Sequence, residues 1–110
     1  MNPPTSVRRF RKSCRLSQYE LAELLDVGQS SISRIEAGTL PEPNVLLSLI
    51  VLFPQGLEAL FPSHMQAVAE DTVTRAANLH RRLDGKRDRA SARKRAWLDE
   101  LVARVTPLPA

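Results

Sequence analysis

Cysteine, glycine and aromatic residues are scarce in this 110-residue chain, and each scarcity excludes some kinds of fold or site. The single cysteine, Cys14, has no partner in the chain, which excludes an intramolecular disulfide and a cysteine metal site. We expect Cys14 to act as a small apolar residue on the inward side of the first helix. Only four glycines and five aromatics stand beside 43% apolar residues, so the composition predicts helices around an aliphatic core.

Long apolar runs and catalytic motifs are also missing. The longest apolar run, residues 45–53, falls far short of the ~20 residues that span a bilayer, and MNPPTSVRRF lacks the apolar stretch of a signal peptide. We therefore expect a soluble, cytoplasmic protein. No glycine-rich phosphate loop, nucleophile motif or acid pair is present, and His64 and His80 stand apart from other metal-ligating residues. We accordingly expect neither an enzyme nor a bound cofactor or metal.

One stretch, LSQYELAELLDVGQSSISRIEAG, predicts two short helices joined by a tight turn. Ser17 and Glu20 have the spacing of a capping box, in which each side chain satisfies a free backbone N–H, so a helix begins at Gln18. It ends at residues 26–28, because aspartate tolerates and glycine readily adopts a left-handed backbone. The second helix covers residues 29–37 and stops before a glycine.

The second of these helices presents a polar face opposite its apolar side. Ile32 and Ile35 have the spacing of buried positions. The outward positions are Gln29, Ser30, Ser33 and Arg34. None of these four side chains belongs in a core, although an ordinary solvated surface is an alternative to a binding role.

Helices are also predicted on both sides of this stretch. Thr5 or Ser6 can cap a first helix that runs to about Cys14, and Pro43 suits the first position of a helix over residues 45–53. A short helix follows near residues 57–61. Since the helix over 45–53 is apolar almost all round, it needs cover on two sides, from the C-terminal helices or from a second copy of the chain.

The pattern changes after Pro62. Ser63 and Gln66 repeat the capping-box spacing, which predicts a helix from about His64. Its apolar positions alternate in steps of four and three, as in a helix-pair interface: Met65, Ala69, Thr72, Ala76, Leu79 and Leu83. A stop at Asp84-Gly85 then separates it from a last helix, which begins at about Asp88 and carries Trp97, Leu98, Leu101, Val102 and Val105.

Residues 7–61 resemble the helix-turn-helix domain shared by phage lambda/434-type repressors and Cro proteins, the Xre family of bacterial regulators. The resemblance lies in VRRFRK, LSQYELAELL, SSISRIEAG, a proline at position 41 with an aliphatic helix behind it, and LEALF. Asp26 departs from the family, which usually has glycine there, and Gly28 replaces the usual small hydroxyl cap. The resemblance implies a five-helix lambda-repressor-like domain over residues 1–62. With the helices predicted after Pro62, the whole chain is expected to be all-α, and residues 63–110 are expected to form a C-terminal helical dimerisation region, because the first domain has little surface left for self-association.

The resemblance also implies that the third helix lies in the major groove of double-stranded DNA. The chemistry of its outward face fits that role independently, because glutamine can pair with adenine, arginine with guanine, and serine with a base or a phosphate. Base contacts are therefore expected from Gln29, Ser30, Ser33 and Arg34, and phosphate contacts from Gln18, Thr39 and Asn44. In the family the residue matching Gln18 braces the residue matching Gln29, and the pair matching Arg11 and Glu36 is structural.

The function that follows is a sequence-specific transcriptional regulator, a repressor that binds a palindromic operator as a homodimer through residues 63–110. The alternative is an antitoxin or adaptor, whose N-terminal domain autoregulates while its C-terminal region binds a protein. Residues 81–95 bear on this choice, because they hold eight basic and two acidic side chains, whereas the net charge of the whole chain is only +4. This basic segment is a solvated surface, a second phosphate-binding element or a site for an acidic protein.

Overall fold

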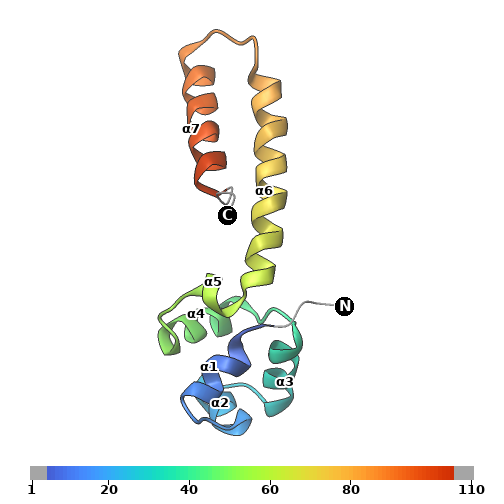
Figure 1. Cartoon of the computed structure of the whole chain (residues 1–110), viewed down its shortest axis with the longest axis vertical. Coiled ribbons are helices and arrows are strands. Elements are labelled where there is room, and N and C mark those ends of the chain that lie inside the picture. Colours follow the sequence, from blue (N-terminus) through green and yellow to red (C-terminus); the bar gives the residue numbers. More distant parts are fainter. Residues whose placement is uncertain (1–4, 106–110) are drawn as a thin grey trace. The chain divides into compact units, whose positions relative to one another are not determined.

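A computed structural model describes residues 5–105, and every regular element in this range is an α-helix (Figure 1). The helices are α1 (Val7–Ser13), α2 (Gln18–Leu25), α3 (Gln29–Ala37), α4 (Pro43–Leu52), α5 (Leu57–Leu60), α6 (Pro62–Leu83) and α7 (Arg89–Val105). They form two compact units, a first unit that ends at Met65 and a second that begins at Gln66, within α6. The predicted all-α fold is confirmed. None of the helices in the described range is long and apolar enough to cross a membrane.

A single apolar core holds the first unit together. It consists of Val7, Leu21, Ala22, Leu25, Ile32, Ile35, Val45, Leu49, Phe53, Leu60 and Phe61. All five helices α1 to α5 contribute to it, as the helical spacing of these residues requires. The segment before α1 is tied to the same core, because the Thr5 hydroxyl donates to the carbonyl of Ile35 at 3.0 Å. This core positions the outward face of α3.

The start of α2 forms the predicted capping box. The Glu20 backbone N–H donates to Ser17 Oγ at 3.1 Å, and the Ser17 backbone N–H donates to Glu20 Oε1 at 2.8 Å. The two hydrogen bonds from Ser17 hold the pKa of the Glu20 carboxyl below its ordinary value. The predicted beginning of this helix at Gln18 is confirmed.

In the turn between α2 and α3, Asp26 is the residue with a left-handed backbone. Asp26 has φ 54° and ψ 48°, whereas Gly28 has an ordinary φ of −78° and ψ of 157°. Aspartate therefore occupies the position where the family usually has glycine, in a conformation that its short polar side chain tolerates. Gly38 then ends α3 with φ 127°, a value that L side chains rarely adopt.

The prediction for Cys14 is wrong, because Cys14 is exposed. Helix α1 ends at Ser13, and the chain then turns through Arg15, which has φ 61°. Cys14 thus lies beyond the last residue of the helix and does not continue its inward stripe. Phe10 is the last apolar residue of α1 that packs on the core, with its ring centroid 5.8 Å from that of Phe53.

Helix α4 starts with Pro43 at its N-terminus, as predicted, and only part of its apolar surface is buried. Val45 and Leu49 belong to the core, whereas Leu47 and Val51 are 61% and 81% exposed. Apolar side chains therefore line the outer surface of α4. What covers this surface stays a prediction.

Helix α6 begins at Pro62 and not at about His64, so the capping box predicted for Ser63 and Gln66 is wrong. Proline suits a first helical turn because its φ is already helical and its missing N–H would have no partner there. Ser63 consequently lies inside the helix. The Met65 backbone N–H already donates to the Phe61 carbonyl, at 2.9 Å.

Two helices, not one rod, follow Pro62, as predicted. Helix α6 ends at Leu83, and Gly85 has φ 83° in the connecting loop. Asp88 then caps α7, since its carboxylate accepts the Ser91 backbone N–H at 3.0 Å. Hydrogen bonds from Ser91 also lower the pKa of Asp88 below its ordinary value.

Helices α6 and α7 run antiparallel in the second unit and share a small core (Figure 1). Ala76, Leu83 and Leu98 are buried, and Leu101 and Val102 pack at the edge of this cluster. The predicted apolar seam is therefore correct at Ala76 and Leu83. Leu79, at the same spacing, is 37% exposed and lies outside this cluster, so its place in a helix interface stays a prediction.

Candidate nucleic-acid interface

The outward face of α3 is polar and accessible. Ile32 and Ile35 are buried on the inner side of the helix, as predicted. Ser30, Ser33 and Arg34 are exposed, and Gln29 is half-buried. The half-burial of Gln29 has a specific cause, which is a contact with the first residue of α2.

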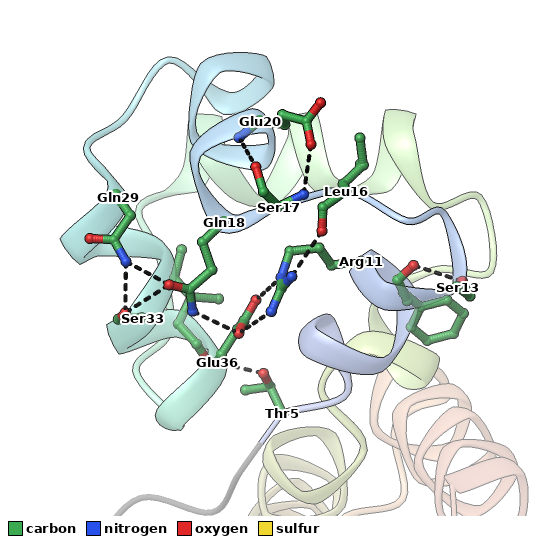
Figure 2. A network of polar contacts seen from close by, with 12 residues as sticks. Thr5, Arg11, Ser13, Leu16, Ser17, Gln18, Glu20, Gln29, Ser33 and Glu36 are labelled. Carbon is green, nitrogen blue, oxygen red and sulfur yellow. Dashed lines mark hydrogen bonds and ion pairs between the residues drawn. The ribbon is translucent and has the colours of Figure 1, made fainter.

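Gln18 joins α2 to the outer face of α3 through its side-chain amide (Figure 2). Its Oε1 accepts a hydrogen bond from Gln29 Nε2 at 2.5 Å and a longer one from Ser33 Oγ at 3.4 Å. Its Nε2 donates to Glu36 Oε1 at 3.1 Å. The contact between Gln18 and Gln29 that the family resemblance implies is thus present.

Behind Gln18, Glu36 is anchored by an ion pair with Arg11 (Figure 2). Arg11 Nε lies 2.7 Å from Glu36 Oε2, and Arg11 Nη2 lies 3.2 Å from Glu36 Oε1. Arg11 Nη1 donates to the Leu16 carbonyl at 2.8 Å, which also holds the connection before α2. The Arg11 and Glu36 side chains are only 10% and 6% exposed, so the pair implied by the resemblance is a largely buried one.

The ionisation of Glu36 is set by opposing effects. Burial raises the pKa of the Glu36 carboxyl, but hydrogen bonds from Arg11 and Gln18 lower it more, and the charges of Arg11 and Arg8 add to that lowering. The pKa of Glu36 therefore lies below its ordinary value. The hydrogen bond to Glu36 raises the pKa of Arg11. Both partners are consequently charged at neutral pH, and Glu36 acts only as an acceptor.

The remaining predicted residues lie outside this network. Arg34 and Thr39 line a separate hollow of about 150 Å³, where Arg34 Nη2 donates to Ser31 Oγ at 3.4 Å. Asn44 is exposed in the first turn of α4. The structure therefore brings Gln18, Gln29 and Ser33 together, places Arg34 beside Thr39, and leaves Ser30 and Asn44 apart.

Arg8 is a residue of this surface that sequence reasoning missed. It lies in α1 and lines a shallow hollow of about 460 Å³ together with Arg11, Gln18, Ser33, Glu36 and Ala37. Arg8 is exposed, so it adds a solvent-accessible positive charge to the hollow that Gln18 and Ser33 also line. Its spacing of three residues from Arg11 on the same helix was the available signal.

A comparison with protein families identifies the N-terminal half of the chain. Residues 7–59 match the family model described as Helix-turn-helix. Together with the α2–turn–α3 geometry, this match defines a DNA-binding transcriptional regulator of the helix-turn-helix class. More particularly, the matched domain belongs to the Xre, lambda-repressor-like family, as its sequence resemblance predicts. No match was found among curated proteins or among solved structures.

Proposed function

We propose that this protein is a sequence-specific regulator that inserts α3 into the major groove of duplex DNA. Gln29, Ser30, Ser33 and Arg34 would then meet base edges, because they form the outward side of α3. The observation that carries this proposal is the hydrogen-bonded chain from Arg11 through Glu36 and Gln18 to Gln29. Such a chain holds a base-reading amide in one orientation before DNA arrives.

The orientation of Gln29 follows from the acceptor at the other end of this chain. Ionised Glu36 can only accept, so Gln18 must point its Nε2 at Glu36 and its Oε1 at Gln29. Gln29 must in turn point its Nε2 at Gln18. This leaves Gln29 Oε1 for a ligand, whereas Gln29 Nε2 also donates to Ser33 Oγ at 3.5 Å. Adenine offers the matching N6 donor and N7 acceptor, and pairing with N7 would replace the long contact to Ser33.

Phosphate contacts would surround these base contacts. Gln18 is the first residue of α2, where free backbone N–H groups and the helix dipole favour an anion. Thr39 follows the end of α3 and Asn44 lies in the first turn of α4, both exposed, and Arg8 lines the same hollow as Gln18. Contacts before and after α3 in the chain would fix its register on the duplex, although they carry no sequence information themselves.

We further propose that two copies act together, with residues 1–62 binding DNA and residues 63–110 forming the dimer. One recognition helix reads only a few base pairs, and two helices spaced by one turn of DNA, ~34 Å, read a palindrome. The second unit supports this role because Leu79 and Trp97 are 37% and 58% exposed beside a core of only three buried residues. A dimer on a promoter in the cytoplasm would exclude polymerase and act as a repressor.

Selection of binding sites from random duplexes with the full-length protein tests the recognition helix. We expect palindromic sites with half-sites about one helical turn apart. Arg34→Ala should lose preference at one base position, at about 1 to 3 kcal/mol, whereas Asn44→Ala, at a proposed phosphate contact outside the Gln18 network, should weaken binding to all sequences alike. Arg75→Ala, an exposed arginine of the second unit, is the control. If Arg34→Ala selects the same sites as the wild type, α3 is not the recognition helix.

Measurement of the oligomeric mass in solution tests the dimer. Trp97→Ser should shift the protein from dimer to monomer, because a large apolar side chain would leave the interface. Val51→Ser, at an apolar position of α4 that is 81% exposed against 58% for Trp97, is the control. A monomer produced by Val51→Ser and not by Trp97→Ser would move the interface to α4. A copurifying protein on the second unit in place of a second copy would favour the adaptor alternative.

A further inference from the structure

Positive charge is concentrated at the end of the second unit where α6 turns into α7. Because the two helices are antiparallel, the last turn of α6, the loop and the first turns of α7 meet at this end (Figure 1). The exposed basic side chains there are Arg81, Arg82, Lys86, Arg87, Arg89, Arg93 and Lys94, which we name the basic tip. Basic residues of α6, of the loop and of α7 thus lie at one end of the second unit.

The acidic residues of this segment are occupied elsewhere. Asp88 caps α7 through Ser91, and Asp84 lies 3.7 Å from His80 Nδ1. Within residues 5–105, no ion pair involves a side chain of the basic tip. Two carboxylates, one of which lies within the field of Lys86, therefore offset only part of the charge of seven basic side chains, and the tip keeps a net positive charge.

The shape of the tip is held by a basic residue that does not belong to it. Arg95 is half-buried, and its Nη1 donates to the Leu83 carbonyl at 2.5 Å and to the Lys86 carbonyl at 3.0 Å. These hydrogen bonds join α7 to the end of α6 and to the loop. They hold the helix ends together although like charges surround them, so the backbone that carries the basic side chains is fixed.

The composition of the basic tip distinguishes between its possible partners. Protein interfaces have a core rich in aromatic and apolar side chains and poor in charge. The exposed residues between Asp84 and Lys94 are only Asp, Gly, Lys, Arg and Ala. A phosphate backbone, in contrast, requires closely spaced cations and no apolar contact, and arginine suits phosphate geometry well. The tip therefore fits a polyphosphate better than an acidic protein.

We propose that the basic tip binds the phosphate backbone of the same duplex that α3 reads, as a second contact independent of base sequence. The proposal rests on DNA binding by the first unit. Because both contacts belong to one chain, binding through α3 raises the effective concentration of phosphate around the tip. Each phosphate that the tip contacts releases condensed counterions, so the tip makes the affinity of the whole protein more dependent on salt.

Titration of DNA binding against salt tests the basic tip. The full-length variant Arg82→Gln/Arg87→Gln removes two tip charges, and Arg75→Gln/Arg104→Gln removes two exposed charges of the same helices outside the tip. The tip variant should flatten the slope of log affinity against log salt by ~0.9 for each lost phosphate contact, ~1.8 in all. The affinity difference from wild type should then shrink about tenfold between 50 and 200 mM salt.

Three further readouts separate this inference from the proposed function. The tip variant should change the slope equally on the selected operator and on a random duplex, and it should select the same sites as the wild type. A slope equal to that of the control variant overturns the tip contact and leaves recognition by α3 intact. A tip variant that loses dimer mass also overturns it, in favour of self-association. Wild-type protein that binds no duplex at all removes both proposals.

Discussion

The ion pair between Arg11 and Glu36 makes the sharpest prediction about stability. Arg11→Met keeps the apolar length of the side chain and removes three hydrogen bonds, two to Glu36 and one to the Leu16 carbonyl. Glu36 is then a carboxylate with only 6% of its side chain exposed and Gln18 as its remaining donor. Removing one partner of a buried ion pair costs about 3 to 5 kcal/mol, a large part of the free energy of unfolding of a small domain.

Urea unfolding followed by two spectroscopic signals shows whether the first unit, and not the second, loses this free energy of unfolding. Trp97 is the only tryptophan and lies in α7, so its fluorescence reports the second unit, whereas circular dichroism reports the helices of both. With an m-value of about 2 kcal/mol per molar urea, Arg11→Met should lower the midpoint of the first unit by about 2 M. The fluorescence transition of Trp97 is the internal control.

A double-mutant cycle decides whether the loss comes from the uncompensated charge. Glu36→Gln keeps an amide oxygen that Gln18 can donate to and removes the charge. We therefore expect Arg11→Met/Glu36→Gln to be more stable than Arg11→Met alone. A loss below about 1 kcal/mol for Arg11→Met, the range of exposed pairs, would refute the reasoning, as would strict additivity of the two substitutions.

Three other predictions follow from particular residues. The folded-state pKa of Glu36 is lowered, so its contribution to stability is present at neutral pH and lost as pH falls from about 4.5 through that pKa; urea midpoints from pH 7 to 3 should fall less in Glu36→Gln than in wild type, where the lowered pKa of Glu20 accounts for part of the remaining loss. Ser17→Ala should lower the free energy of unfolding by about 1 kcal/mol in urea titrations, and an unchanged value would show that the capping box does not stabilise the fold. Arg8→Gln should flatten the salt slope of DNA binding by ~0.9, whereas Arg9→Gln, its exposed neighbour, should leave the slope unchanged.

Local signals in the sequence predicted the helices of the first unit well. The capping box at Ser17, the proline at position 43 and the glycine at position 38 mark helix ends through contacts within one turn, so their effect does not depend on distant residues. The failures lie where two local signals compete. At Pro62 the fixed φ of proline overrides the capping-box spacing of Ser63, and α6 begins two residues earlier than expected.

Exposure was harder to predict than helix position. Cys14 lies at helical spacing from Phe10, yet it is exposed because α1 ends one residue before it. Leu79 has seam spacing, yet it is 37% exposed. Periodicity gives the apolar side of a helix, but the extent of its burial depends on the width and length of the neighbouring element.

The sequence by itself determined the all-helical fold, the turn before α3 and the outward row of hydrogen-bonding side chains, because capping and periodicity act over a few residues. Resemblance to a family added the pairing of Arg11 with Glu36. Tertiary structure alone decided that Arg8 stands beside Gln18, that the cations of two helices form one basic tip, and that Arg95 fastens it. These arrangements depend on how the chain returns on itself, and contacts between residues on different elements are set only when those elements pack together.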